Sequence, residues 1–93
     1  METTGELELG QVVKSSAGRD SDKFFIVVDI IDKNYVLLVD GSLRKLDNPK
    51  KKKVKHIKKT NKIFDELKNK IEAKEKFNNA YIRKLLASLV KEN

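Results

Sequence analysis

The residues best able to do chemistry in this sequence are lysines, gathered in one block past the middle of the chain. Residues 44–62 hold ten lysine or arginine side chains against one aspartate, a net charge of +9, whereas residues 1–43 hold four basic side chains against eight acidic ones. Such a block attracts a polyanion, because its cations displace counterions condensed along a nucleic-acid backbone. The candidates for RNA contact are Arg44, Lys45, Lys50, Lys51, Lys52, Lys53, Lys55, His56, Lys58 and Lys59.

A simpler interpretation of this block is a solvated edge strand whose charges only deter aggregation. Charge runs are usually solvated faces, and the run by itself does not decide between the two uses. The concentration of the excess charge in one segment favours RNA. We therefore expect residues 44–59 to carry most of the RNA affinity, with all four lysines of residues 50–53 facing solvent.

Arg19 is a further candidate, in a polar loop predicted over residues 15–22. Gly18 in this loop is expected to supply a positive φ. The Arg19 guanidinium could contact a phosphate or a base edge. It could equally pair with Asp20 and stiffen the turn, so both interpretations stay open.

Three aromatic side chains on apolar segments are candidates for base stacking. Phe24, Phe25 and Tyr35 could stack on unpaired bases, although such residues belong more often to a core. Neighbouring side chains on a strand point to opposite faces, so one phenylalanine should be buried and the other at least partly exposed.

No catalytic or metal-binding pattern accompanies the basic block. The sequence has no cysteine, and its one histidine, His56, fits a surface side chain better than a ligand. There is no phosphate-binding glycine loop or nucleophile elbow, so we expect no enzymatic activity, no metal and no other cofactor. The first ten residues are acidic and the longest apolar runs have five residues, which predicts neither a signal peptide nor a membrane span. A cytoplasmic location is expected.

The elements that must position these residues are predicted as short strands followed by helices. β-branched and aromatic runs indicate the strands, and Asp40-Gly41 is typical of a two-residue hairpin turn. Gly10 is expected at a bulge or bend, and residues 32–34 at a turn. The predicted strands are residues 7–14, 24–31 as the central strand, 35–39, 42–46, and 53–57 as a lysine-rich closing edge.

Beyond His56 the apolar spacing becomes helical. One helix is predicted around Leu67, with Thr60 or Asn61 as its N-cap. A second is predicted to follow Asn78 as its N-cap, with Phe77 and Ile82 at the spacing of a hydrophobic staple. The apolar face of this second helix, Tyr81, Ile82, Leu85, Leu86, Leu89 and Val90, is expected to pack on the strands.

Three segments in this order resemble a known family. GQVVKSSAGRD at residues 10–20, running into residues 24–28, resembles a KOW motif. VDGSLRKL at residues 39–46 and PKKKKVKHI at residues 49–57 extend the likeness to the bacterial KOW-domain RNA-binding proteins. These are related to the fourteenth-numbered large-subunit ribosomal protein of archaea and eukaryotes. The resemblance covers about residues 7–57, and Asp22 stands where the family loop often has a second glycine.

The resemblance implies a mainly β fold with C-terminal α structure, a small SH3-like antiparallel barrel of KOW type followed by one or two helices. Its expected parts are a flexible N-terminus (1–6), a barrel with a basic edge (7–59) and a helical extension (60–93). The implied function is binding of ribosomal RNA or a ribosome-associated particle in translation, through the lysine-rich strand and the KOW loop, by a monomer. The alternative is a protein-interaction module that docks on a transcription or translation factor.

Overall fold

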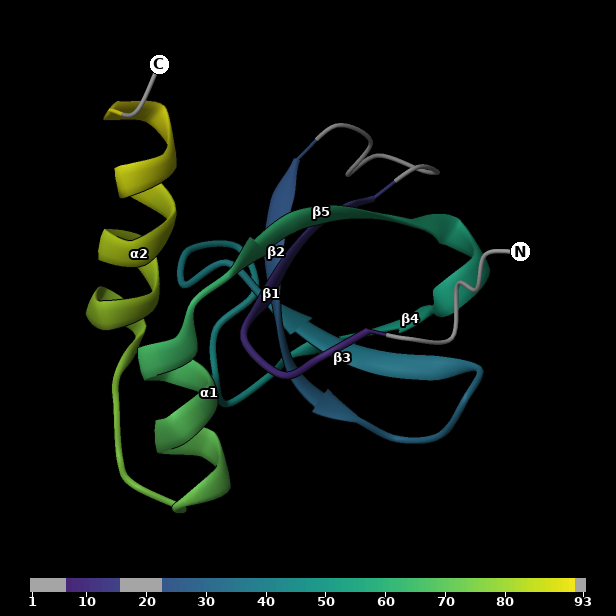
Figure 1. Ribbon diagram of the computed structural model, residues 1–93, viewed down its shortest axis with the longest axis horizontal. Helices are drawn as coiled ribbons and strands as arrows, with labels where there is room; N and C mark the ends of the chain where they lie inside the picture. The colour runs from purple at the N-terminus through teal and green to yellow at the C-terminus, as the bar shows by residue number, and fades with distance from the viewer. Residues whose placement is uncertain (1–6, 16–22, 92–93) are drawn as a thin grey trace.

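The strand predicted to be central, near residues 24–31, lies at the centre of a five-stranded antiparallel sheet. The computed structural model describes residues 7–15 and 23–91, and within these residues the sheet order is β4-β3-β2-β1-β5 (Figure 1). Two helices follow the sheet, which confirms the predicted small barrel-like β domain with C-terminal helices. The elements are β1 (Gln11–Ser15), β2 (Phe24–Ile30), β3 (Tyr35–Val39), β4 (Lys50–Lys53), the 3-10 helix η1 (Val54–His56), β5 (Ile57–Ile63), α1 (Asp65–Glu72) and α2 (Asn79–Lys91).

The sheet curls around a first hydrophobic core. η1 joins the two edge strands β4 and β5, so the chain turns from one edge of the sheet to the other within three residues (Figure 1). Side chains that alternate along the strands point into the curl, as the two-residue period of a strand requires. The buried members of this core are Leu7, Val13, Phe25, Val27, Val36, Leu38 and Val54.

A second core lies between the other face of the sheet and the helices. α1 and α2 stand next to each other on one side of the sheet, at the end away from η1 (Figure 1). The buried members of this core are Val12, Ile26, Val39, Phe64, Leu67, Ile82 and Leu85. The predicted packing of the second helix on the strands is therefore confirmed, with Tyr81, Leu86 and Leu89 partly buried beside it. The side chain of Val90 lies outside the described residues.

Two glycines allow the helices to come this close. Gly10 and Gly41 both have φ of +81°, a conformation that side chains disfavour. A Cβ on Gly10 would lie 2.8 Å from the Phe64 carbonyl oxygen, just before α1. A Cβ on Gly41 would lie 2.7 Å from the carbonyl oxygen of Asn79, the first residue of α2. The bend expected at Gly10 is confirmed, and β1 begins directly after it.

The predicted strand over residues 42–46 is wrong, because the preceding turn is not a two-residue hairpin. Oδ1 of Asp40 accepts hydrogen bonds from the backbone N–H groups of Ser42 (2.9 Å) and Arg44 (2.8 Å). The Arg44 carbonyl in turn accepts from the N–H groups of Asp40 and Gly41. These bonds close a compact loop, and Leu46 N–H donates to Oδ1 of Asn79 at the start of α2 rather than to a strand.

The closing edge strand predicted over residues 53–57 is also misplaced. The two edges of the sheet are β4, which ends at Lys53, and β5, which begins at Ile57, and η1 lies between them. Val54 is buried in the first core, and its N–H donates to the Asn34 carbonyl at 2.8 Å. Because Val54 is held by this burial and this hydrogen bond, the chain turns at η1, where a straight strand was expected.

The predicted start of the first helix is wrong, whereas that of the second is confirmed. Thr60 and Asn61 lie in β5, and the N-cap of α1 is Phe64. Oδ1 of Asn78 accepts from the N–H of Tyr81 at 2.9 Å, which confirms Asn78 as the cap of α2. Phe77 packs against the second core that contains Ile82, as a hydrophobic staple requires. The expectations for residues 1–6, 16–22 and 92–93, including the φ of Gly18, lie outside the described residues.

Among the described residues no helix is long and apolar enough to cross a membrane.

Candidate nucleic-acid interface

The four lysines of β4 alternate between two environments. Lys50 and Lys52 pair with Leu38 and Val36 of β3, whose side chains are buried in the first core. Directly opposed residues of antiparallel strands share a face, so these two lysines lie along the core side. They are half-buried, and each takes part in a further interaction. Only Lys51 and Lys53 are exposed, so the expectation that all four lysines face solvent is wrong.

Lys51 lies against an aromatic ring. Its Nζ is 4.7 Å from the centroid of the Tyr35 ring, and the two residues are diagonal neighbours on the outer face of β3 and β4. A cation at this distance is attracted to the face of the ring. Tyr35 is half-buried, and so offers part of its surface between lysines of β4.

The basic segment continues without a break through η1 into β5. Lys55, Lys58 and Lys59 are exposed, and His56 is half-buried. Lys58 pairs with Lys14 of β1, whose Nζ lies 5.1 Å from the centroid of the Phe24 ring. Phe24 is 40% exposed and Phe25 is 1% exposed, which confirms that one of the two phenylalanines faces out.

A buried glutamine fixes the position of β5. The ladder between β1 and β5 shifts register between Gln11 and Val13. Nε2 of Gln11 donates to the Thr60 carbonyl at 3.0 Å, and Oε1 of Gln11 accepts from the N–H of Glu8 at 2.8 Å. The Thr60 hydroxyl donates to the Val12 carbonyl at 2.8 Å. Since these side chains replace ladder bonds at the irregularity, β5 is held beside β1 with Lys58 and Lys59 outward.

Two of the other predicted contacts lie elsewhere. Arg44 and Lys45 are in the loop that packs on α2, at the opposite end of β4 from η1. Arg44 is half-buried, and its backbone groups close the loop at Asp40. Arg19 lies outside the described residues, so its role stays a prediction.

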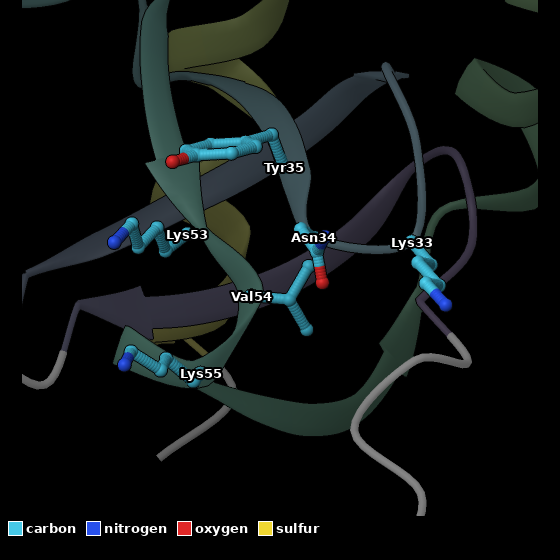
Figure 2. A pocket seen from close by; sticks show the side chains of 6 residues that line it. All are labelled: Lys33, Asn34, Tyr35, Lys53, Val54 and Lys55. Carbon is cyan, nitrogen blue, oxygen red and sulfur yellow. The ribbon is translucent and has the colours of Figure 1, made fainter.

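A pocket of about 280 Å³ opens where the turn between β2 and β3 meets η1 (Figure 2). It is lined by Lys33, Asn34, Tyr35, Lys53, Val54 and Lys55. The sequence analysis missed Lys33 and Asn34. The only sequence signal was the turn itself, since their approach to η1 depends on a hydrogen bond between residues twenty positions apart, from Val54 N–H to the Asn34 carbonyl.

We call the exposed lysines around η1, namely Lys51, Lys53, Lys55, Lys58 and Lys59, the basic surface. None of them forms an ion pair with a carboxylate among residues 7–15 and 23–91. The ion pairs that are formed lie on the helical side, from Lys68 to Glu8 at 2.6 Å and from Lys70 to Glu75 at 3.5 Å. Within the part of the chain that the structure describes, no carboxylate therefore pairs with the positive charge of the basic surface.

No three histidine, aspartate or glutamate side chains of the described part of the chain are grouped as a metal site would need. What this surface offers is positive charge, two lysine–aromatic contacts and one small pocket. Such features suit recognition of a phosphate backbone rather than bond-making chemistry.

Comparison with known proteins finds a ribosomal protein among the relatives of this chain. The large ribosomal subunit protein eL14 of Staphylothermus marinus is 32% identical over 59 residues, which are 63% of this chain and 62% of that protein. This chain is similar to a ribosomal protein. The similarity agrees with the ribosomal part of the resemblance read from the sequence. The chain spans less than two thirds of the relative's length. No protein-family model matches this chain.

Proposed function

We propose that this protein binds structured RNA, in the first place ribosomal RNA or a ribosome-associated particle, through the basic surface. In this proposal it acts as a cytoplasmic monomer in translation and has no enzymatic activity. The boundary predicted at residue 59 falls inside β5 (Ile57–Ile63). The RNA-binding KOW barrel of this proposal therefore runs from residue 7 to the end of β5, and the two helices that follow are an extension that supports it. The observation that carries the proposal is the set of exposed lysines on β4, η1 and β5 without carboxylate partners in the described residues.

The placement of these lysines suits an RNA backbone. They lie on two edge strands and the short helix between them, so they project from a rigid sheet rather than from a tail. A double-stranded RNA exposes phosphates and 2′-hydroxyls and is recognised mainly by shape and charge. Lysine, a flexible point charge, serves that purpose without exact geometry.

The similarity to a ribosomal protein supports the same use. The relative is named as a protein of the large ribosomal subunit, and on this ground we infer ribosomal RNA as the partner of this chain. The likeness favours ribosomal RNA over other polyanions, and it favours a structural over a catalytic role.

A charge reversal with a matched control tests the proposal. Lys55→Glu with Lys58→Glu removes four units of charge from the basic surface. Lys76→Glu with Lys84→Glu makes the same change at two exposed lysines on the helical side. The first variant should bind a ribosomal RNA fragment at least about tenfold more weakly, and the second should bind within about twofold of the original. Fluorescence anisotropy with labelled RNA measures both.

Salt dependence separates this proposal from non-ionic binding. If about five phosphates are neutralised, log affinity should fall against log salt with a slope of roughly −3.5 to −4.5.

Equal losses of affinity in the two charge-reversal variants would mean that net charge alone matters. Unchanged affinity in both would reduce the basic surface to a solvated edge.

The alternative of a protein-interaction module loses its main surface. The apolar face of α2, on which a partner would dock, packs against the sheet in the second core. Ile82 is fully buried there, and Leu85 is 8% exposed. A partner could reach this face only after α2 had left the barrel.

A further inference from the structure

We propose that the pocket between the β2–β3 turn and η1 takes one unpaired nucleotide of a bound RNA. The base would stack on the Tyr35 ring, and the adjoining phosphates would meet Lys33, Lys53 and Lys55. This inference rests on the proposed RNA binding and adds to it a preference for RNA that offers an unstacked base.

The pocket walls combine the groups that such a nucleotide needs. Figure 2 shows the Tyr35 ring edge-on above Lys53 and Val54. Lys33 lies on the right of this view, and Asn34 lies between Val54 and Lys33. An aromatic face stacks on any base, because every base has a π-face. The Asn34 amide has both donors and an acceptor for the edge of that base.

One face of the Tyr35 ring remains for a base. The cation on the ring is Lys51, which stands opposite Leu37, two positions along β4 from Lys53. Lys53 stands opposite Tyr35, and the pocket residues Val54 and Lys55 follow it toward η1, on the side of Tyr35 away from Lys51. A base entering the pocket would therefore approach Tyr35 from the side away from Lys51.

The walls are held in place before any ligand arrives. Oδ1 of Asp32 accepts from the N–H groups of Asn34 (2.7 Å) and Tyr35 (2.9 Å), which sets the turn. Val54 is anchored in the first core, and its N–H bond to the Asn34 carbonyl ties the turn to η1. Because the pocket is already ordered, binding a ligand there costs little free energy for ordering its walls.

The charge of the pocket favours a phosphate-bearing guest. Lys33, Lys53 and Lys55 come from the turn, from β4 and from η1, and all three are exposed. None forms an ion pair within residues 7–15 and 23–91. The nearest carboxylate in sequence is Asp32, whose Oδ1 already accepts the two turn bonds.

Size limits the guest to one nucleotide. Small-molecule pockets span roughly 300–1,000 Å³, and this one, at about 280 Å³, lies just below that range. A base pair inside a duplex cannot present its face to a side chain, whereas bulges and loops can. The pocket therefore discriminates between paired and unpaired RNA, and the basic surface does not.

Two RNA hairpins provide the test. They share stem, loop and fluorescent label, the loop being a tight tetraloop, and one carries a single bulged nucleotide in the stem. The original protein should bind the bulged hairpin about fivefold or more tightly than the fully paired one, given the usual worth of one base–aromatic stack. Tyr35→Leu should abolish this preference, so that the variant binds the two hairpins equally. Tyr35→Phe, which keeps the ring, should retain it.

A second variant guards against a folding defect at Tyr35. Lys33 is exposed, lies outside the basic surface and has no structural partner in the described residues. Lys33→Gln should reduce affinity for the bulged hairpin more than for the paired one, whereas Lys76→Gln, with the same loss of charge, should reduce both alike. Thermal melting of each variant establishes that it is folded.

The outcomes separate this inference from the proposed function. Failure of the original protein to bind either hairpin would overturn the RNA-binding proposal, and the pocket with it. Equal binding of both hairpins would overturn the pocket inference alone. So would a bulge preference that survives in both Tyr35→Leu and Lys33→Gln, because the unpaired nucleotide would then be recognised elsewhere.

Discussion

Lysines on the two sides of this molecule have different neighbours. On the helical side, residues 63–93 hold seven basic side chains against five acidic ones, and Lys68 and Lys70 each reach a carboxylate. Around η1, none of the five lysines of the basic surface forms an ion pair with a carboxylate of the described residues. Paired lysines on a surface add little stability, and unpaired ones are free to meet a ligand. The same residue type thus ties segments together on one side and, in the proposal, binds RNA on the other.

The apolar residues show the complementary division. The helical side covers the outer face of the sheet and provides the second core, whereas the η1 side shares only the first core through Val54. Stability should therefore respond most strongly to changes beneath the helices. RNA affinity should respond most strongly to changes around η1.

The largest effect on stability is expected at Ile82. Ile82→Ala leaves a cavity in the second core and should lower the free energy of unfolding by about 2–5 kcal/mol. Leu43→Ala makes a similar truncation at a side chain that is 68% exposed, and should change it by about 0.5 kcal/mol or less. Urea denaturation measures both. A loss below about 1 kcal/mol for Ile82→Ala would show that α2 contributes little to the fold. The apolar face of α2 would then be available for docking to a partner protein.

An intermediate effect is expected within β4, where one strand contains both kinds of lysine. Lys50→Ser with Lys52→Ser removes side-chain stems that cover the first core, and should lower the free energy of unfolding by about 1 kcal/mol. Lys51→Ser with Lys53→Ser makes the same chemical change on the exposed face and should mainly weaken RNA binding. Urea midpoints and RNA titrations of both pairs test the division. Equal stability losses would contradict the alternation of the two faces.

The predictability of each element depended on how local its cause is. The strands at residues 24–31 and 35–39 follow from apolar runs, and the Asn78 cap follows from a side chain that bonds three residues ahead. The strand predicted at residues 42–46 does not form, because contacts with α2 hold this segment as a loop. Nη1 of Arg83 donates to the Gly41 carbonyl at 2.6 Å, across 42 positions of sequence.

The candidate site divides in the same way. The chemistry of the lysine block is visible in composition, but the exposure of each lysine depends on its register against β3. Lys33 and Asn34 join the site only because η1 folds back onto their turn. Neither the register nor that contact is encoded in the local pattern around the residues concerned.

The smallest effect is expected at the ion pair between Lys68 and Glu8. Nζ of Lys68 lies 2.6 Å from Oε1 of Glu8, and this hydrogen bond and charge contact raise the pKa of Lys68 above its ordinary value of 10.5. A raised lysine pKa means that the folded state holds the proton more tightly than the unfolded state. The stabilisation is therefore fully present below about pH 10.5, and it is lost as the pH rises through the higher folded-state pKa.

Glu8→Gln should remove this contribution and leave the rest of the fold unchanged. Both side chains are partly exposed, at 32% for Lys68 and 48% for Glu8, so water and salt screen the pair. Thermal melting at pH 8 and low salt should show a small destabilisation of the variant. The difference from the original should shrink in high salt and again above pH 10.5. A difference that persists under both conditions would mean that the Glu8 side chain stabilises the fold by something other than its charge.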